Sequence, residues 1–160
     1  MTSTNDSGRR VGSAAEMQSL GERLGAKLRV GDGVALVGPL GAGKTTFVQG
    51  LARGMGVAAD RHVASPTFAL VNEHPGRTPL VHADFYRINE AREVFELGLD
   101  EAYDRAAVVV EWAERFPDAT IADRLIITLG IEGDGARRLT TSASGPRGAA
   151  LAAALNGAND

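Results

Sequence analysis

Cysteine is absent from this 160-residue chain, and long apolar runs and a charge excess of either sign are missing too. Without thiols there are no disulfides and no thiolate metal sites, so a reducing compartment is permitted. No apolar run reaches the roughly 20 residues that a membrane-spanning helix needs, and no secretory apolar segment begins the chain. A formal net charge of -3 provides no general attraction for nucleic acid or anionic lipid. We therefore expect a cytoplasmic protein without membrane contact.

The most informative stretch is the glycine-rich segment at 38–45, GPLGAGKT. Its spacing is that of a phosphate-binding loop, and it lies between an apolar run at 34–37 and a helical pattern. Such a loop turns its backbone N–H groups toward phosphate, at the positive end of the next helix. A glycine-rich turn that merely precedes a helix is disfavoured, because strand, loop and helix are all in register. The predicted nucleotide-binding residues of the loop are Leu40, Gly41, Ala42, Gly43, Lys44, Thr45 and Thr46.

Three of these side chains have a predicted task in the chemistry. The ammonium of Lys44 is expected to reach the β- and γ-phosphates. The hydroxyl of Thr45 is expected to complete the ligand shell of a Mg²⁺ ion, and that of Thr46 to donate to the α-phosphate.

The pattern of apolar runs and helical stretches predicts an α/β fold, with a single P-loop NTPase domain whose mixed, mostly parallel sheet is flanked by helices. Pro75-Gly76 joins two short apolar runs, which predicts an antiparallel hairpin. We expect a flexible N-terminal arm over 1–12, the ATPase domain over 13–142, and an alanine-rich C-terminal tail over 143–160.

The sequence predicts two helices outside the phosphate loop and leaves the role of each one undecided. Residues 13–16 match a capping box for a helix at about 14–29, whose start precedes the phosphate-loop strand. Ser13 and Ala14 are therefore candidates to contact the base, and packing on the sheet is the alternative. Residues 90–103 are predicted to be one acidic helix, a surface that could meet a partner.

Two predicted strands end in a carboxylate, Asp84 after the run at 80–83 and Glu111 after the run at 106–110. An acid at a strand end can serve a nucleotide's metal or its attacking water. Glu111 is favoured as the metal-facing acid, because it follows the more regular buried-strand pattern. Either acid is alternatively an ordinary solvated carboxylate, and Trp112 either stacks on a base or packs in the core.

Other polar residues have two interpretations each. Pro66 restrains the entry to a strand expected at 68–71, which puts Thr67 where nucleotide-sensing loops lie, although a turn hydroxyl is equally compatible. Arg137 and Arg138 either approach phosphates or form a solvated strand edge. The three histidines lack the spacing that gathers metal ligands on one helix.

Two motifs that are missing from the chain reduce the number of candidate functions. The chain has no Asn-Lys-x-Asp motif, with which GTPases recognise the base, and no Leu-Ser-Gly-Gly-Gln signature of transporter ATPases. Both classes are therefore disfavoured. A small P-loop kinase that phosphorylates a metabolite remains the alternative, with Arg137-Arg138 as its only lid candidate.

Five motifs in order resemble the TsaE family, formerly called YjeE. They span 38–46, 65–68, 82–87, 96–99 and 111–114, within a resemblance that covers about 13–140. The resemblance implies a domain that binds ATP and Mg²⁺ and hydrolyses ATP slowly. It also implies action with TsaD and TsaB in placing threonylcarbamoyl on the tRNA adenosine next to the anticodon. The ATPase would support or reset that machine without transferring the group, and would meet tRNA only through the complex.

The resemblance also implies roles for individual residues. Lys44 and Thr45 would hold phosphate and metal, and Glu111 would help to hold the metal. Asp84 would be needed for hydrolysis and Thr67 would lie on a switch-like loop, which makes Lys44, Asp84, Thr67 and Glu111 the catalytic candidates. Trp112 would lie near the nucleotide. Ala113 departs from the Glu-Trp-Pro-Glu form often seen in the family, and the last twenty residues are left unassigned.

Overall fold

The parallel strands β5 (Leu80–Asp84), β6 (Ala107–Glu111), β3 (Gly33–Val37) and β7 (Arg124–Ile131) form the centre of the sheet, in that spatial order. The computed structural model describes residues 2–4, 8–66 and 68–157. β5 and β6 consist almost wholly of buried residues because helices cover both of their faces. Their short runs of valine, leucine and alanine suit that environment.

Antiparallel strands complete the sheet on both sides, so it is mixed, as expected. β4 (Val71–His74) pairs with β5 as the predicted hairpin. On the other side β8 (Arg137–Ser144) pairs with β7, and β1 (Thr2–Thr4) and β2 (Arg9–Val11) both pair with β8.

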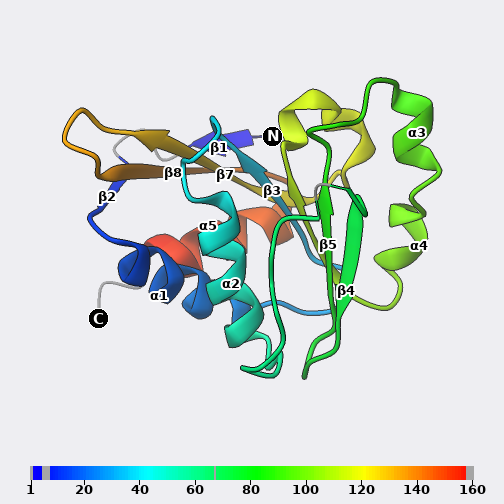
Figure 1. The fold of residues 1–160 in the computed structure, drawn as a ribbon, viewed down its shortest axis with the longest axis horizontal. Helices are drawn as coiled ribbons and strands as arrows, with labels where there is room; N and C mark the ends of the chain where they lie inside the picture. The colour runs from blue at the N-terminus through cyan, green and yellow to red at the C-terminus, as the bar shows by residue number, and fades with distance from the viewer. Residues whose placement is uncertain (1, 5–7, 67, 158–160) are drawn as a thin grey trace.

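Helices cover the two faces of the sheet unequally (Figure 1). The helices α1 (Ala14–Gly25), α2 (Lys44–Gly54) and α5 (Pro146–Asn156) share one apolar core with the sheet. The other face is covered by the short helices α3 (Ala91–Phe95) and α4 (Leu99–Ala102). The 3₁₀ turns η1 (Ala113–Arg115) and η2 (Pro117–Ala119) follow β6. Among the described residues no helix is both long enough and apolar enough to cross a membrane.

Glycines let α1 and α2 pack backbone against backbone. A Cβ atom added at any of four positions would lie between 2.0 and 2.2 Å from a backbone oxygen of the opposite helix. These positions are Gly21, Gly25, Gly50 and Gly54. Because α2 carries the phosphate-binding residues in its first turn, this close packing also fixes the position of the site.

The N-terminal arm and the C-terminal tail differ from expectation. Residues 2–4 and 9–11 form strands that pair with β8, because β8 is eight residues long and offers β1 and β2 a hydrogen-bonding edge. The predicted tail contains the end of β8 and the helix α5, whose Leu151 and Leu155 are buried. The Asp123 carboxylate accepts hydrogen bonds from the first N–H groups of α5, at Arg147 N (3.1 Å) and Gly148 N (2.7 Å).

Three element boundaries were also wrong. The single helix predicted at 90–103 is two short helices, because Gly98 adopts φ 73° between them. α1 ends at Gly25, before the expected limit at 29, and the predicted strand at 68–71 begins only at Val71. The Ser13 cap is confirmed, since Glu16 N donates to Ser13 Oγ at 3.1 Å. The second contact of the predicted capping box differs, because the Glu16 carboxylate accepts from Gly12 N and not from Ser13 N.

Gly50→Ala tests the packing of α1 on α2. The added methyl group would lie 2.0 Å from Gln18 O, so the helices must separate. Overpacking of this kind costs roughly 1–3 kcal/mol, which outweighs the gain of up to about 1 kcal/mol in helix propensity. We expect thermal unfolding several degrees below wild type by calorimetry. Gly133→Ala, where nothing lies within 4 Å of the added Cβ, serves as the control. Equal unfolding temperatures for both variants would refute the packing account.

Candidate nucleotide-binding site

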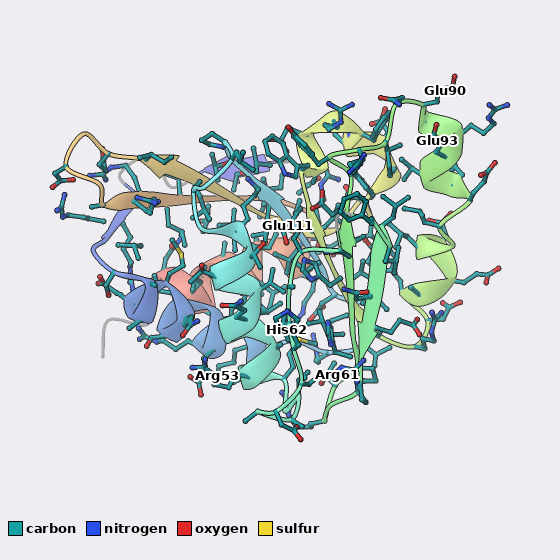
Figure 2. The ribbon with its side chains drawn as sticks, in the orientation of Figure 1. Arg53, Arg61, His62, Glu90, Glu93 and Glu111 are labelled. Carbon is teal, nitrogen blue, oxygen red and sulfur yellow. The ribbon has the colours of Figure 1, made fainter. Side chains whose placement is uncertain are left out.

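Parallel strands bring the candidate residues to one edge of the sheet. Asp84 and Glu111 end neighbouring strands and are register partners, and the loop after β3 lies beside them. Figure 2 shows Glu111 between α2 and β5, away from Arg53 at the far end of α2. A cavity of about 340 Å³ lies here, lined by Leu40, Gly41, Gly43, Lys44, Thr45, Thr46, Ser65, Asp84, Tyr86, Glu111 and Trp112. Of the loop residues predicted to bind, only Ala42 is fully buried, below the cavity.

The loop conformation requires glycine at two places. Gly43, the residue before α2, has φ 106°, a conformation that other L-residues rarely adopt. At Gly38, with φ 153°, an added Cβ would lie 2.4 Å from Leu129 O of β7. The loop is therefore curled over the first turn of α2, as a phosphate-binding nest requires.

Lys44 lies across this loop and is 5% exposed. Its Nζ donates to Gly38 O (2.6 Å) and Pro39 O (2.9 Å), and lies 4.1 Å from the centroid of the Trp112 ring. Burial lowers the pKa of Lys44, and the nearby carboxylates, Glu111 first, oppose that shift. The ammonium is thus held between two carbonyl oxygens of the loop and the Trp112 ring.

Thr45 and Glu111 form a possible metal-binding pair. Thr45 Oγ1 lies 3.2 Å from both carboxylate oxygens of Glu111, which is 2% exposed. A hydroxyl and a carboxylate are the donors that Mg²⁺ takes from protein when phosphates and water supply its other ligands. The residue types therefore fit a nucleotide-bound magnesium ion. Within the described part of the chain, no group of three or more His, Cys, Asp or Glu side chains could hold a metal ion. A magnesium ion at this pair would therefore need phosphates and water as its other ligands.

Asp84 is held through both of its oxygens. Ser65 Oγ donates to Oδ2 at 2.5 Å, and Tyr86 N donates to Oδ1 at 2.8 Å. The side chain is 2% exposed, yet it lines the cavity. These contacts give Asp84 one orientation beside Glu111. Thr67 lies outside the described residues.

Trp112 follows β6 in an unusual backbone conformation, with φ 58°. This left-handed residue turns the chain sharply and places the indole ring at the cavity wall. The ring is half-buried and packs on Tyr86, with centroids 4.8 Å apart. It combines packing on Tyr86 with exposure to the cavity, and stacking on a base stays a prediction.

A second hollow of about 170 Å³ adjoins the first and shares Gly41, Gly43 and Thr46 with it. Ser13 and Ala14 line it, together with Arg137 from the start of β8. An Arg137 NH2 group donates to Gly41 O at 3.0 Å, so this arginine contacts the phosphate loop from the side. The hollow extends the first cavity toward the beginning of α1.

Sequence reasoning did not single out several polar groups at the site. His82 contacts Glu111, Ser65 contacts Asp84, and Glu114 Oε2 lies 3.4 Å from Gly38 N. Ser65, His82 and Glu114 all fall within the motifs recognised above. The order of residues along these strands and turns does not indicate which carboxylate or loop atom each of the three side chains contacts.

A glycine-rich cradle at the edge of a parallel sheet, with acids on the neighbouring strands, defines the class of P-loop NTPases. A family model described as "Threonylcarbamoyl adenosine biosynthesis protein TsaE" matches residues 11–139. The chain belongs to the TsaE family, which confirms the resemblance.

Individual relatives agree with this family. A protein named tRNA threonylcarbamoyladenosine biosynthesis protein TsaE from Streptomyces coelicolor is 40% identical over 139 residues, covering 82% of this chain and 93% of the relative. A protein of the same name from Bacillus subtilis is 40% identical over 134 residues, covering 82% of each. The crystal structure of Bacillus subtilis YdiB matches with a TM-score of 0.83 at 31% identity, covering 100% of this chain and 99% of that one.

Lys44→Ala tests the phosphate-binding role of the loop. Removing a charge-assisted hydrogen-bond donor costs roughly 1.5–3 kcal/mol, which corresponds to about 10- to 100-fold weaker binding. We expect that loss for ATP in isothermal titration calorimetry, with an unchanged circular dichroism spectrum. Lys27→Ala, at the exposed and only other lysine, is the matched control. Undiminished ATP affinity in Lys44→Ala would show that the loop does not act as described.

The contact of Lys44 with Trp112 provides a second measurement. Trp112 is the only tryptophan, so its fluorescence reports on this ring alone. Phosphate binding draws the ammonium away from the indole face, and we expect the emission to change on ATP addition. In Lys44→Ala the same ATP concentration should leave the emission unaltered. An equal change in both proteins would mean that the signal does not come from this contact.

Proposed function

We propose that this chain is an ATP-binding and slowly hydrolysing subunit required for threonylcarbamoylation of the tRNA adenosine next to the anticodon. It acts in the cytoplasm with TsaD and TsaB as a regulatory or resetting ATPase, does not transfer the threonylcarbamoyl group, and meets tRNA only through the complex. The family and the names of its relatives support the pathway. The observation that carries the ATPase is the contact of Thr45 with Glu111 at the mouth of the phosphate loop.

The two adjoining hollows suit the two ends of ATP. The triphosphate lies in the larger one, where loop N–H groups, Lys44 and Thr46 bind phosphate oxygens. The base lies in the smaller one, beside Ser13 and Ala14. Trp112 flanks the phosphates from the opposite wall.

Hydrolysis is assigned to Asp84, Glu111 and the switch-like loop that carries Thr67. Thr45 and Glu111 would hold Mg²⁺, and the bound ion would neutralise charge that develops on the phosphates. Asp84, oriented by Ser65 and Tyr86 N, positions the attacking water. Thr67 is the proposed sensor of the γ-phosphate on its connecting segment.

The charge of the cavity supports slow turnover in the isolated subunit. Among the described residues that line the larger cavity, Lys44 is the only cation. An arginine supplied by a second protein accelerates related reactions by roughly 10³- to 10⁵-fold. Arg137 lines only the smaller hollow, so the larger cavity leaves this role to a partner, which accords with a regulatory role.

The proposal is tested by measuring ATPase turnover alone and with purified TsaD and TsaB. We expect weak magnesium-dependent turnover that changes when both partners are added. The same mixture, with tRNA and a threonylcarbamoyl donor, should form the modified adenosine only when this chain is present. Turnover indifferent to the partners, together with stoichiometric phosphorylation of a metabolite, would favour the kinase alternative.

Asp84→Asn tests the hydrolytic acid separately. An amide keeps the shape but is a poor acceptor of a proton from water, and loss of such a group costs roughly 10²- to 10⁴-fold in rate. We expect turnover to fall by that factor while ATP affinity is retained. Asp100→Asn, at an exposed acid of α4, is the control. Wild-type turnover in Asp84→Asn would remove Asp84 from the mechanism.

A further inference from the structure

His82 lies in β5 at the base of the site and is 0% exposed. Its ring Nε2 lies 2.6 Å from Glu111 Oε2, the shortest contact that this carboxylate makes with any described residue. Its other ring nitrogen, Nδ1, is buried without a hydrogen-bond partner in the described part of the chain. Glu111 is thus the polar anchor of this ring.

The proposed role of Glu111 assigns the direction of this contact. A metal-facing carboxylate is an anion and only accepts hydrogen bonds, so in that role of Glu111 the ring Nε2 is the donor to Oε2.

A buried imidazole needs a reason at this position. His82 is the register partner of Val109 and follows Leu80 on the same face of β5, and both of these neighbours are fully buried apolar residues. Burying a polar ring costs free energy unless its groups are paired, and an apolar side chain would avoid that cost. The hydrogen bond to Glu111 is the compensating interaction that this structure shows.

His82 also distinguishes between the two oxygens of Glu111. Thr45 Oγ1 lies 3.2 Å from each oxygen and therefore does not favour one over the other. His82 contacts Oε2 and so restricts rotation of the carboxylate, which leaves Oε1 as the oxygen without a histidine donor. A restrained carboxylate binds a small, strictly octahedral ion better than a rotating one.

We propose that His82 is a positioning residue, which orients the Glu111 carboxylate toward the magnesium ion by donating a hydrogen bond from Nε2. This inference rests on the proposed function, because it assigns a partner to the metal-facing acid of that site. Outer partners of this kind typically change metal affinity by about 10- to 100-fold when they are removed.

His74 provides a matched control. It is a second buried histidine, 3% exposed, on the neighbouring strand β4. Its Nδ1 accepts a hydrogen bond from Arg61 Nε at 2.7 Å, so its polar anchor is an arginine and not Glu111. Burial, then the charge of Arg61 and the nearby His82, lower the pKa of His74, in keeping with a neutral ring. His74→Leu therefore removes a buried histidine from the same sheet that has no hydrogen bond to Glu111.

The first experiment uses the metal-free protein and needs no activity. Long-range ¹H–¹⁵N spectra of the histidine rings should show Nε2 of His82 as the protonated nitrogen that donates to Glu111. In Glu111→Gln the ring signals of His82 should shift strongly, whereas those of His74 should not. Ring signals of His82 that are the same in wild type and Glu111→Gln would overturn the inference.

The second experiment measures metal binding with a non-hydrolysable ATP analogue and Mn²⁺ as the paramagnetic probe. His82→Leu should weaken Mn²⁺ binding to the protein–nucleotide complex by about 10- to 100-fold and leave metal-free nucleotide binding unchanged. His82→Gln, whose amide can donate from a similar position, should recover most of the loss. His74→Leu should bind Mn²⁺ as wild type does.

The outcomes separate the inference from the proposed function. If wild type binds no nucleotide, the function fails. If wild type binds nucleotide and Mn²⁺ and His82→Leu binds both equally well, only the inference fails. An equal loss in His82→Leu, His82→Gln and His74→Leu would mark a general packing effect and would also overturn the positioning role.

Discussion

Two buried carboxylates at the ends of adjacent parallel strands are the constraint on which this site depends. Asp84 and Glu111 are register partners, each about 2% exposed, so both must be hydrogen-bonded or neutralised. Ser65 Oγ and the Tyr86 N–H donate hydrogen bonds to Asp84. Thr45 and His82 contact Glu111. Lys44 supplies the nearest positive charge, and these same acids oppose the lowering of its pKa by burial. The polar groups of the site thus form one mutually dependent set.

The rest of the fold holds this set in place. The close packing of α1 on α2 fixes the helix whose first turn carries Lys44 and Thr45. At the end of β3 opposite the phosphate loop, Arg147 of α5 forms an ion pair with the buried Asp32, at 2.8 Å. That ion pair ties the C-terminal helix to the strand that leads into the phosphate loop, and the Asp123 cap ties it to the start of β7. The alanine-rich C-terminal segment therefore contributes to the support of the site.

Much of the fold could be predicted because its signals are local. The strand, loop and helix around 34–55 follow from apolar runs, glycine spacing and a helical repeat, and the hairpin at Pro75-Gly76 follows from its turn residues. The errors fall where one residue's conformation or a distant partner decides. Gly98 at φ 73° divides a helix that periodicity makes continuous. β1 and β2 are short polar segments whose pairing depends on the edge of β8 more than 120 residues later.

The sequence by itself determined the class of site and most of its residues, because the spacing of a phosphate loop and the acids at strand ends reflect local backbone geometry. Only the tertiary structure decided how those residues contact one another. It brought Glu111 to Thr45 and His82, and Asp84 to Ser65, because the pairing of β5 with β6 and the placement of α2 over them join segments that lie 19 to 66 residues apart. Contacts across that separation depend on register and helix packing, which leave no periodic trace in a single sequence.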